Sequence, residues 1–244
     1  MSEDAEKPLV LPNGDGILRR EHFSDEGVRR YAAEFAKGGG PPPMSEEDRE
    51  ASRAQALARL SSGDDVWFFG YGSLMWNPMI EVAESRAARI EGWHRHFCLT
   101  LNLGRGTPEF PGLMLGLDRG GACTGVVHRV AAAKREAELK ILWQREMMSG
   151  AYLPCWVRAE TDGGALDAVT FVVRRDHPRY EGKLAEEVVA ARIAQASGIL
   201  GTNRDYLYRT AAHLRALGVA GDPLIPLAAK VRELANEHGS NVAE

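Results

Sequence analysis

The stretch WFFGYGSLMWNP, residues 67–78, decides how we expect this chain to fold. A short apolar run rich in aromatic residues reaches Gly70 and Gly72, and the stretch closes on Pro78. This pattern predicts a buried strand that runs into a loop, where glycine escapes the usual restriction on φ. Consecutive backbone N–H groups in such a loop can converge on an anion without any charged side chain. A plain turn is the alternative, and the spacing alone leaves both interpretations open.

The rest of the chain predicts an α+β fold. Strands are expected at residues 81–90, 92–101, 112–117, 125–130, 152–158 and 168–174, with a turn at 118–121. One helix interrupts them at residues 132–148, and later helices are expected at 184–196, 203–217 and 222–237. Asn203 is the expected cap of the second of these later helices. Because helices gather after the strands, the order favours a small mixed or antiparallel β-barrel flanked by helices.

Residues 1–64 are expected to form an N-terminal helical arm that is partly mobile. Residues 1–15 mix charge, Pro and Gly without a core pattern. One helix is expected from Ser24, and another from Ser45, where Asp48 completes a capping pattern. Both helices carry few large apolar residues, so we expect them to pack on the outside of a body formed by residues 65–244, which includes the C-terminal helices.

Composition narrows the possible functions. The chain has 244 residues and a net charge of −4, so no basic field favours nucleic acid or an anionic membrane surface. No apolar run approaches the ~20 residues that cross a bilayer, and the first residues lack the apolar core of a secretion signal. Cys98, Cys123 and Cys155 are dispersed, which disfavours disulfide and zinc frameworks and fits a reducing cytoplasm. His94 and His96 lack a third metal ligand at suitable spacing, so no metal site is predicted.

Glu146 is the most informative single residue of the interrupting helix. Leu139, Leu142, Trp143 and Glu146 follow helical spacing, so the glutamate continues the row that should face the interior. Burial and the negative end of the helix dipole would both raise the pKa of its carboxyl group toward the range that suits a general base or acid. The alternative is that Glu146 turns outward to pair with Lys140 or Arg145, and periodicity does not choose between the two. Glu136 is a weaker candidate at the other end of the helix.

Four motifs in order carry a resemblance to a known family. They are Phe69-Gly70-Tyr71-Gly72-Ser73-Leu74 with Trp76, Arg105-Gly106-Thr107-Pro108 with Pro111-Gly112, Arg145-Glu146 before Gly150 and Tyr152, and Asn203 with Tyr206-Leu207. Between about residues 65 and 217 the chain resembles the ChaC-type γ-glutamylcyclotransferases. It departs from them at Gly104, where many members have histidine.

The resemblance implies a γ-glutamylcyclotransferase-like barrel with no metal and no organic cofactor. It implies a catalytic domain at residues 65–244 and a lyase activity in which glutathione, or a related γ-glutamyl peptide, is split to 5-oxoproline and cysteinylglycine. Glu146 would be the catalytic acid/base. The residues that the resemblance places at the substrate are Phe68, Phe69, Gly70, Tyr71, Gly72, Ser73, Leu74, Arg105, Tyr152 and Tyr206.

The implied chemistry agrees with the residues. The α-amine of the substrate attacks its own γ-carbonyl, so the reaction needs orientation and proton transfer but no enzyme nucleophile. Other γ-glutamyl amino acids or γ-glutamylamines are alternative substrates, and a non-catalytic anion-binding regulatory protein is the alternative of a different class. Whether the protein is a monomer or a dimer is left open by the sequence.

Overall fold

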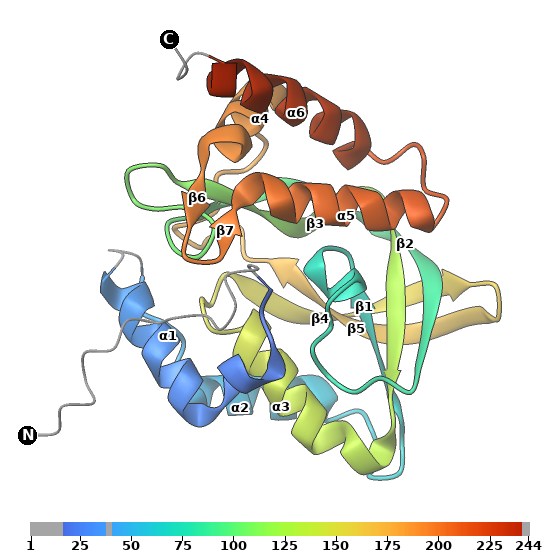
Figure 1. The fold of residues 1–244 in the computed structure, drawn as a ribbon. Helices are drawn as coiled ribbons and strands as arrows, with labels where there is room; N and C mark the ends of the chain where they lie inside the picture. The colour runs from blue at the N-terminus through green and yellow to red at the C-terminus, as the bar shows by residue number, and fades with distance from the viewer. Residues whose placement is uncertain (1–16, 38–40, 241–244) are drawn as a thin grey trace, which may run out of the picture.

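The central element is a closed β-barrel, seen here in a computed structural model that describes residues 17–37 and 41–240 (Figure 1). Residues 1–15, predicted to be mobile, lie outside the described residues. The strands of the barrel, in the order β1-β3-β2-β4-β5, are β1 (Val66–Gly70), β3 (Gly112–Val130), β2 (Glu84–Leu101), β4 (Tyr152–Thr161) and β5 (Gly164–Val173). Strand β1 pairs parallel with β5, and the other pairs are antiparallel. The predicted mixed barrel is therefore confirmed.

Two strands are longer than the sequence predicts. The strands expected at 81–90 and 92–101 form the single strand β2, and those expected at 112–117 and 125–130 form β3. The turn expected at residues 118–121 is wrong, because β2 and β3 stay paired on both sides of it, with a register shift opposite Gly92. Gly92, Gly120 and Gly121 have positive φ, so this shift works as a bulge that bends the pair into the barrel wall.

Helices cover the barrel on two sides (Figure 1). On one side lie α4 (Glu186–Gln195), α5 (Asn203–Ala216) and α6 (Leu224–Ser240), with the small hairpin of β6 (Ser197–Gly198) and β7 (Gly201–Thr202). On the other side lie α1 (Asp25–Lys37), α2 (Glu46–Leu57) and α3 (Arg135–Glu146), with the 3₁₀ turns η2 (Arg20–Phe23) and η4 (Ala132–Lys134).

The predicted cap of α5 is wrong by one residue. Thr202 caps this helix, since its side chain accepts a hydrogen bond from the Asp205 amide. The Asn203 side chain instead accepts from the Leu113 amide at 2.7 Å and donates to the Leu113 carbonyl at 2.9 Å. Asn203 is fully buried, so this amide fastens α5 to the start of β3.

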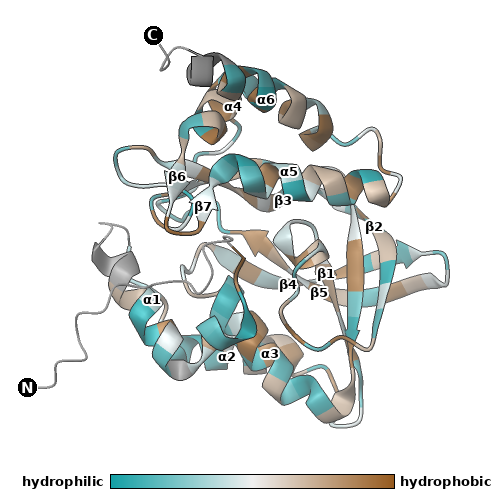
Figure 2. Cartoon of the chain, in the orientation of Figure 1, coloured by the Kyte–Doolittle hydropathy of each residue, from teal (hydrophilic) through white to brown (hydrophobic). Residues whose placement is uncertain are grey.

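The arm helices are attached to the barrel and to α3. Ser45 caps α2 as predicted, accepting from the Asp48 amide, although α2 ends at Leu57 rather than near Ser61. The Trp156 indole on β4 donates to the Ala56 carbonyl of α2 at 2.8 Å. Hydrophilic residues dominate α1 (Figure 2), in agreement with a helix on the outside of the molecule.

Alternation along β1 directs its neighbouring side chains into two separate cores. Phe69 packs in the barrel core, which continues beneath α4, α5 and α6. Phe68 packs in a second core with Leu139, Leu142 and Trp143 of α3. These α3 side chains are at most 1% exposed, and burial of each leucine contributes about 1.5–3 kcal/mol. Packing against Phe68 therefore fixes α3 so that its C-terminal end lies beside the loop that follows β1.

Candidate active site

The loop after β1 brings its backbone very close to Tyr206 of α5. The loop continues into the 3₁₀ turn η3 (Ser73–Met75). A Cβ atom on Gly72 would lie 2.7 Å from the Tyr206 hydroxyl, and one on Gly70 would lie 2.9 Å from the Leu74 backbone. The φ of Gly72 is negative, at −129°, and the lack of space beside the Tyr206 hydroxyl requires glycine here.

Glu146 lies at the C-terminal end of α3 and faces a cavity. Its side chain is only 16% exposed and forms an ion pair with Arg145, with Nε and Oε1 2.9 Å apart. The sequence left open whether Glu146 faces the interior or pairs with Lys140 or Arg145. In the structure it faces the cavity and also pairs with Arg145. Lys140 pairs with Glu46 instead. Burial raises the pKa of the Glu146 carboxyl above its ordinary value, and the Arg145 guanidinium opposes this shift.

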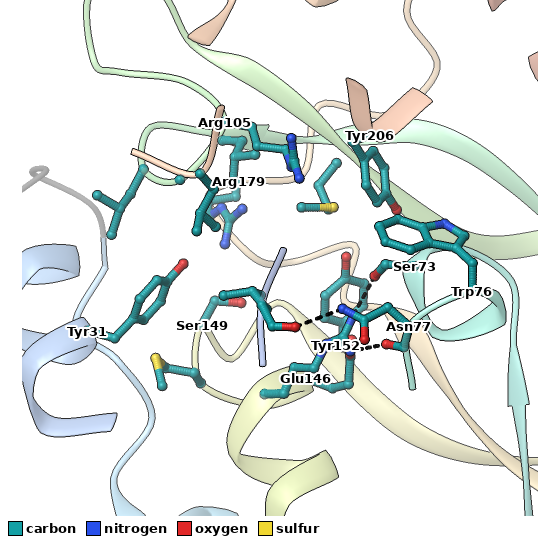
Figure 3. Close-up of a pocket in the computed structure, with 18 residues that line it drawn as sticks. Tyr31, Ser73, Trp76, Asn77, Arg105, Glu146, Ser149, Tyr152, Arg179 and Tyr206 are labelled. Carbon is teal, nitrogen blue, oxygen red and sulfur yellow. Dashed lines mark hydrogen bonds and ion pairs between the residues drawn. The ribbon is translucent and has the colours of Figure 1, made fainter. Parts of the chain in front are cut away.

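Arg145 joins the carboxylate to the glycine loop. Besides its contact with Glu146, the guanidinium donates to the Ser73 hydroxyl and to the Asn77 carbonyl, each at 2.6 Å (Figure 3). The Arg145 side chain is 7% exposed. A planar guanidinium held at three points has little rotational freedom, so it fixes the Glu146 carboxylate relative to Ser73.

Three tyrosines lie near this carboxylate, of which Tyr71 and Tyr206 are buried and Tyr152 is partly buried. The hydroxyl of Tyr71 donates to the Phe171 carbonyl at 2.9 Å, and that of Tyr152 donates to the Leu115 carbonyl at 2.8 Å. The Tyr206 hydroxyl lies near the Ser73 amide, which opposes the rise in its pKa. Burial is the main reason that the pKa of each phenol is raised, and the nearby Glu146 charge adds to it. All three therefore stay neutral hydrogen-bond donors near neutral pH.

The cavity itself measures about 150 Å³ and is lined mainly by apolar atoms. Its lining residues come from the arm, the glycine loop, the barrel and α5 (Figure 3): Leu18, Tyr31, Ser73, Trp76, Asn77, Leu101, Leu103, Gly104, Arg105, Met114, Arg145, Glu146, Met148, Ser149, Tyr152, Arg179, Leu200 and Tyr206. Figure 3 shows Glu146, Ser149 and Asn77 close together, with Arg105 and Arg179 across the cavity from them.

The structure brings five of the predicted site residues to this cavity: Ser73, Arg105, Glu146, Tyr152 and Tyr206. It does not bring the others to the cavity wall. Phe68 stacks on His128 with ring centroids 4.8 Å apart, and Phe69 and Leu74 are buried in the two cores. Gly70, Tyr71 and Gly72 belong to the end of β1 and the loop after it and do not line the cavity. Glu136 lies on the surface, paired with Arg53.

Sequence reasoning missed several lining residues. Arg145 adjoins Glu146 in the motif, and its position beside the catalytic candidate was the available signal. Asn77 and Trp76 stand inside the quoted stretch of residues 67–78 and could have been found there. Arg179, in the segment after β5, and Tyr31 of α1 are brought in by tertiary structure, and no local pattern marks either residue.

Two classes of feature are absent from the part of the chain that the structure describes. Within residues 17–37 and 41–240, no group of three or more His, Cys, Asp or Glu side chains is arranged to hold a metal ion. Across the same ranges, no helix combines the length and the apolar composition needed to cross a membrane. His94 and His96 stack on each other, and His96 pairs with Asp118.

Comparison with known proteins identifies the family of this chain. The model of the ChaC-like protein family matches residues 66–234. The chain belongs to the ChaC-like family. A ChaC-like relative from Escherichia coli (strain K12), named glutathione-specific gamma-glutamylcyclotransferase, is 46% identical over 195 residues, which cover 80% of this chain and 84% of the relative. The Mus musculus glutathione-specific gamma-glutamylcyclotransferase 1 is 33% identical over 194 residues, covering 76% of this chain and 84% of the relative.

Solved structures support the same ChaC-like fold. The crystal structure of a yeast gamma-glutamyl cyclotransferase specific to glutathione, labelled with selenomethionine, matches with a TM-score of 0.64 at 19% identity. The match covers 69% of this chain and 96% of the yeast chain. At this identity the likeness establishes the fold, and it confirms the γ-glutamylcyclotransferase-like barrel expected from the sequence.

Proposed function

We propose that this protein is a γ-glutamylcyclotransferase that cleaves glutathione to 5-oxoproline and cysteinylglycine. The observation that carries the proposal is the buried Glu146 carboxylate, tied through Arg145 to Ser73 of the glycine loop within one cavity. The names of the relatives from Escherichia coli and Mus musculus support glutathione as the substrate.

The reaction makes one bond and breaks another within a single substrate. The α-amine attacks the γ-carbonyl carbon, a C–N bond forms, and a five-membered ring closes. The amide bond to cysteinylglycine then breaks, and the leaving nitrogen takes a proton. Because the nucleophile is tethered to its target, alignment in a tight cavity supplies part of the roughly 7–11 kcal/mol available to well-oriented intramolecular reactions.

Glu146 is the group that we assign to proton transfer. The substrate amine is mostly protonated at neutral pH, so a base must remove a proton before attack. A carboxylate with a raised pKa is a better base than an ordinary glutamate. Once protonated, the same carboxyl can deliver this proton to the leaving nitrogen. The attacking nitrogen loses a second proton as the lactam forms, and Glu146 can pass it to the released amine of cysteinylglycine, which is charged at neutral pH, so that the carboxylate returns to its starting state.

Developing negative charge on the γ-carbonyl oxygen also needs donors. We assign this role to the Ser73 backbone amide and to the Tyr206 hydroxyl, since both residues line the cavity and the hydroxyl can direct its proton at a substrate oxygen. The raised pKa keeps the Tyr206 proton in place at neutral pH. Removal of one donor of this kind costs ~10²–10³ in rate in other enzymes.

The test is a product assay with purified protein. Release of 5-oxoproline is followed by chromatography with glutathione and, separately, with γ-glutamyl-alanine as substrates. We expect release from glutathione to be the faster. A greater kcat/KM for γ-glutamyl-alanine would show that other γ-glutamyl compounds, rather than glutathione, are the preferred substrates. No 5-oxoproline from any of them would favour a non-catalytic binding protein.

Two further assignments belong to this proposal. We place the catalytic domain at residues 65–244, and the family match from residue 66 supports this division from the arm. We also propose a cytoplasmic location, supported by Cys98, Cys123 and Cys155, which are all free thiols.

A further inference from the structure

Two arginines line the cavity besides the one at the reacting centre. The lining contains Arg105, Arg145 and Arg179. Arg145 is directed at Ser73, Asn77 and Glu146, so Arg105 and Arg179 are the lining arginines that do not contact Glu146. A guanidinium in a largely apolar cavity is a suitable donor for an anionic group of a ligand.

Arg179 is held firmly at one end of the cavity. Its Nε donates to the Thr100 carbonyl at 2.6 Å, and its own carbonyl accepts from the Thr100 amide at 2.9 Å. These two bonds anchor the segment after β5 to the end of β2. Figure 3 shows Arg179 and Tyr31 on the opposite side of the cavity from Ser73 and Trp76.

Tyr31 completes this end of the cavity from the N-terminal arm. Its hydroxyl lies near Gly104, the residue before Arg105. A Cβ atom added to Gly104 would be 4.0 Å from the Tyr31 hydroxyl oxygen. Burial raises the pKa of Tyr31 and the Arg179 charge opposes the rise, so the phenol stays protonated beside a cation. The arm is fastened close by, because the Asn77 side chain donates to the Leu18 carbonyl at 2.9 Å. A guanidinium and a neutral hydroxyl together form a suitable pair of donors for a carboxylate.

The proposed substrate has a second carboxylate at the end away from its reacting carbonyl. A γ-glutamyl tripeptide carries one carboxylate beside its reacting amine and a second on its C-terminal residue. The two residues after the reacting carbonyl span at most about 7 Å when extended. If the glutamyl end lies at Ser73 and Glu146, the second carboxylate points toward the other end of the cavity.

We propose that Arg179 and Tyr31 form a subsite that binds the C-terminal carboxylate of the γ-glutamyl peptide, and that they select peptides over γ-glutamylamines. This inference rests on the proposed cyclotransferase function. It gives the N-terminal arm a role in substrate selection, because Tyr31 belongs to α1. A γ-glutamylamine has no carboxylate at that position and gains nothing from Arg179.

The experiment compares glutathione with the same peptide carrying a glycine amide in place of its terminal carboxylate. For the wild-type protein we expect kcat/KM to fall about 10- to 100-fold with the amide, the range for hydrogen bonds to a charged group. Arg179→Gln should raise KM for glutathione by a similar factor, leave kcat nearly unchanged and leave the amide unaffected. Arg179→Lys should recover part of the loss, and Tyr31→Phe should give a smaller loss in the same direction.

The matched control is Arg174→Gln, which removes an arginine charge from the same segment. Arg174 bonds to the Gly150 carbonyl and pairs with Asp176 rather than facing this cavity. We expect this variant to keep the wild-type preference for the free carboxylate, which would exclude a general effect of net charge.

Two results would overturn the subsite. One is equal kcat/KM for glutathione and its amide in the wild-type protein, and the other is an equal loss for both substrates in Arg179→Gln and Arg179→Lys. Absence of any 5-oxoproline would contradict the proposed function instead. In that case, calorimetric titration of Glu146→Gln with each peptide still decides the inference, since tighter binding of glutathione than of its amide supports it and equal binding contradicts it.

Discussion

Substitution of Gly72 by alanine should damage the protein through one identifiable contact. The new Cβ would lie 2.7 Å from the Tyr206 hydroxyl and 3.7 Å from the nearest Leu115 carbon. The first distance is too short for a carbon–oxygen contact, whereas the second is ordinary packing. Tyr206 is 4% exposed and packs edge-on against Phe97 with centroids 6.2 Å apart, so its ring has little room to retreat.

The expected cost follows from this overlap. Overpacking of a core by one methyl group typically costs about 1–3 kcal/mol, and each kcal/mol lowers Tm by about 2–4 °C in a chain of 150–250 residues. The loop must also move away from Tyr206 by several tenths of an ångström. Since a shift of about 1 Å can cost on the order of 10²-fold in rate, we expect a loss in kcat/KM that approaches this value.

A second substitution isolates the contact. In Gly72→Ala combined with Tyr206→Phe, the hydroxyl is gone and the nearest tyrosine atom in the present structure, Cζ, is 3.9 Å from the added Cβ. Thermal unfolding should therefore show the double variant recovering most of the stability lost by Gly72→Ala, as a double-mutant cycle measures. Gly63→Ala is the control, since a Cβ there meets nothing within 4 Å. A Gly72→Ala protein as stable as wild type, or a double variant no more stable than Gly72→Ala, would refute this reasoning.

Two further predictions concern proton transfer and the attachment of α5. Because the Arg145 charge opposes the rise in the pKa of Glu146, Arg145→Gln should raise that pKa further and move the acidic limb of the kcat/KM profile to higher pH. An acidic limb at the wild-type pH would contradict this effect. Asn203→Ala leaves the amide and carbonyl of Leu113 buried without their partner, so urea unfolding should show a loss of on the order of 1–3 kcal/mol or more. Thr202→Ala removes only a helix cap, typically ~1 kcal/mol, and an equal loss in both variants would show that Asn203 does not fasten α5.

Much of the fold was predictable from local pattern. The apolar run before Gly70 predicts β1, and the hydrophobic row through Leu142 and Trp143 predicts a helix buried on one side. The turn expected at residues 118–121 failed because Asp, Arg and two glycines have the same local chemistry in a turn and in a bulge. Pairing with β2 decides between them, and that partner lies far away in the sequence.

Some residues of the candidate site could likewise be predicted from local sequence and others could not. Ser73 and Glu146 stand in motifs, so both could be placed at the site before the structure was known. Asn203 was assigned to a cap because its residue type favours that position, whereas a buried contact with β3 takes its side chain. Tyr31 and Arg179 reach the cavity only through the packing of the arm and of the segment after β5, which no local spacing encodes.

The most direct test of the central claim is the rate of 5-oxoproline release from glutathione by Glu146→Gln. The substitution keeps the size of the side chain and removes its ability to exchange a proton. With folding verified by circular dichroism and thermal unfolding, we predict that kcat falls ~10²–10⁴-fold, the usual contribution of a general acid or base. A folded Glu146→Gln protein that forms 5-oxoproline at the wild-type rate would contradict the account.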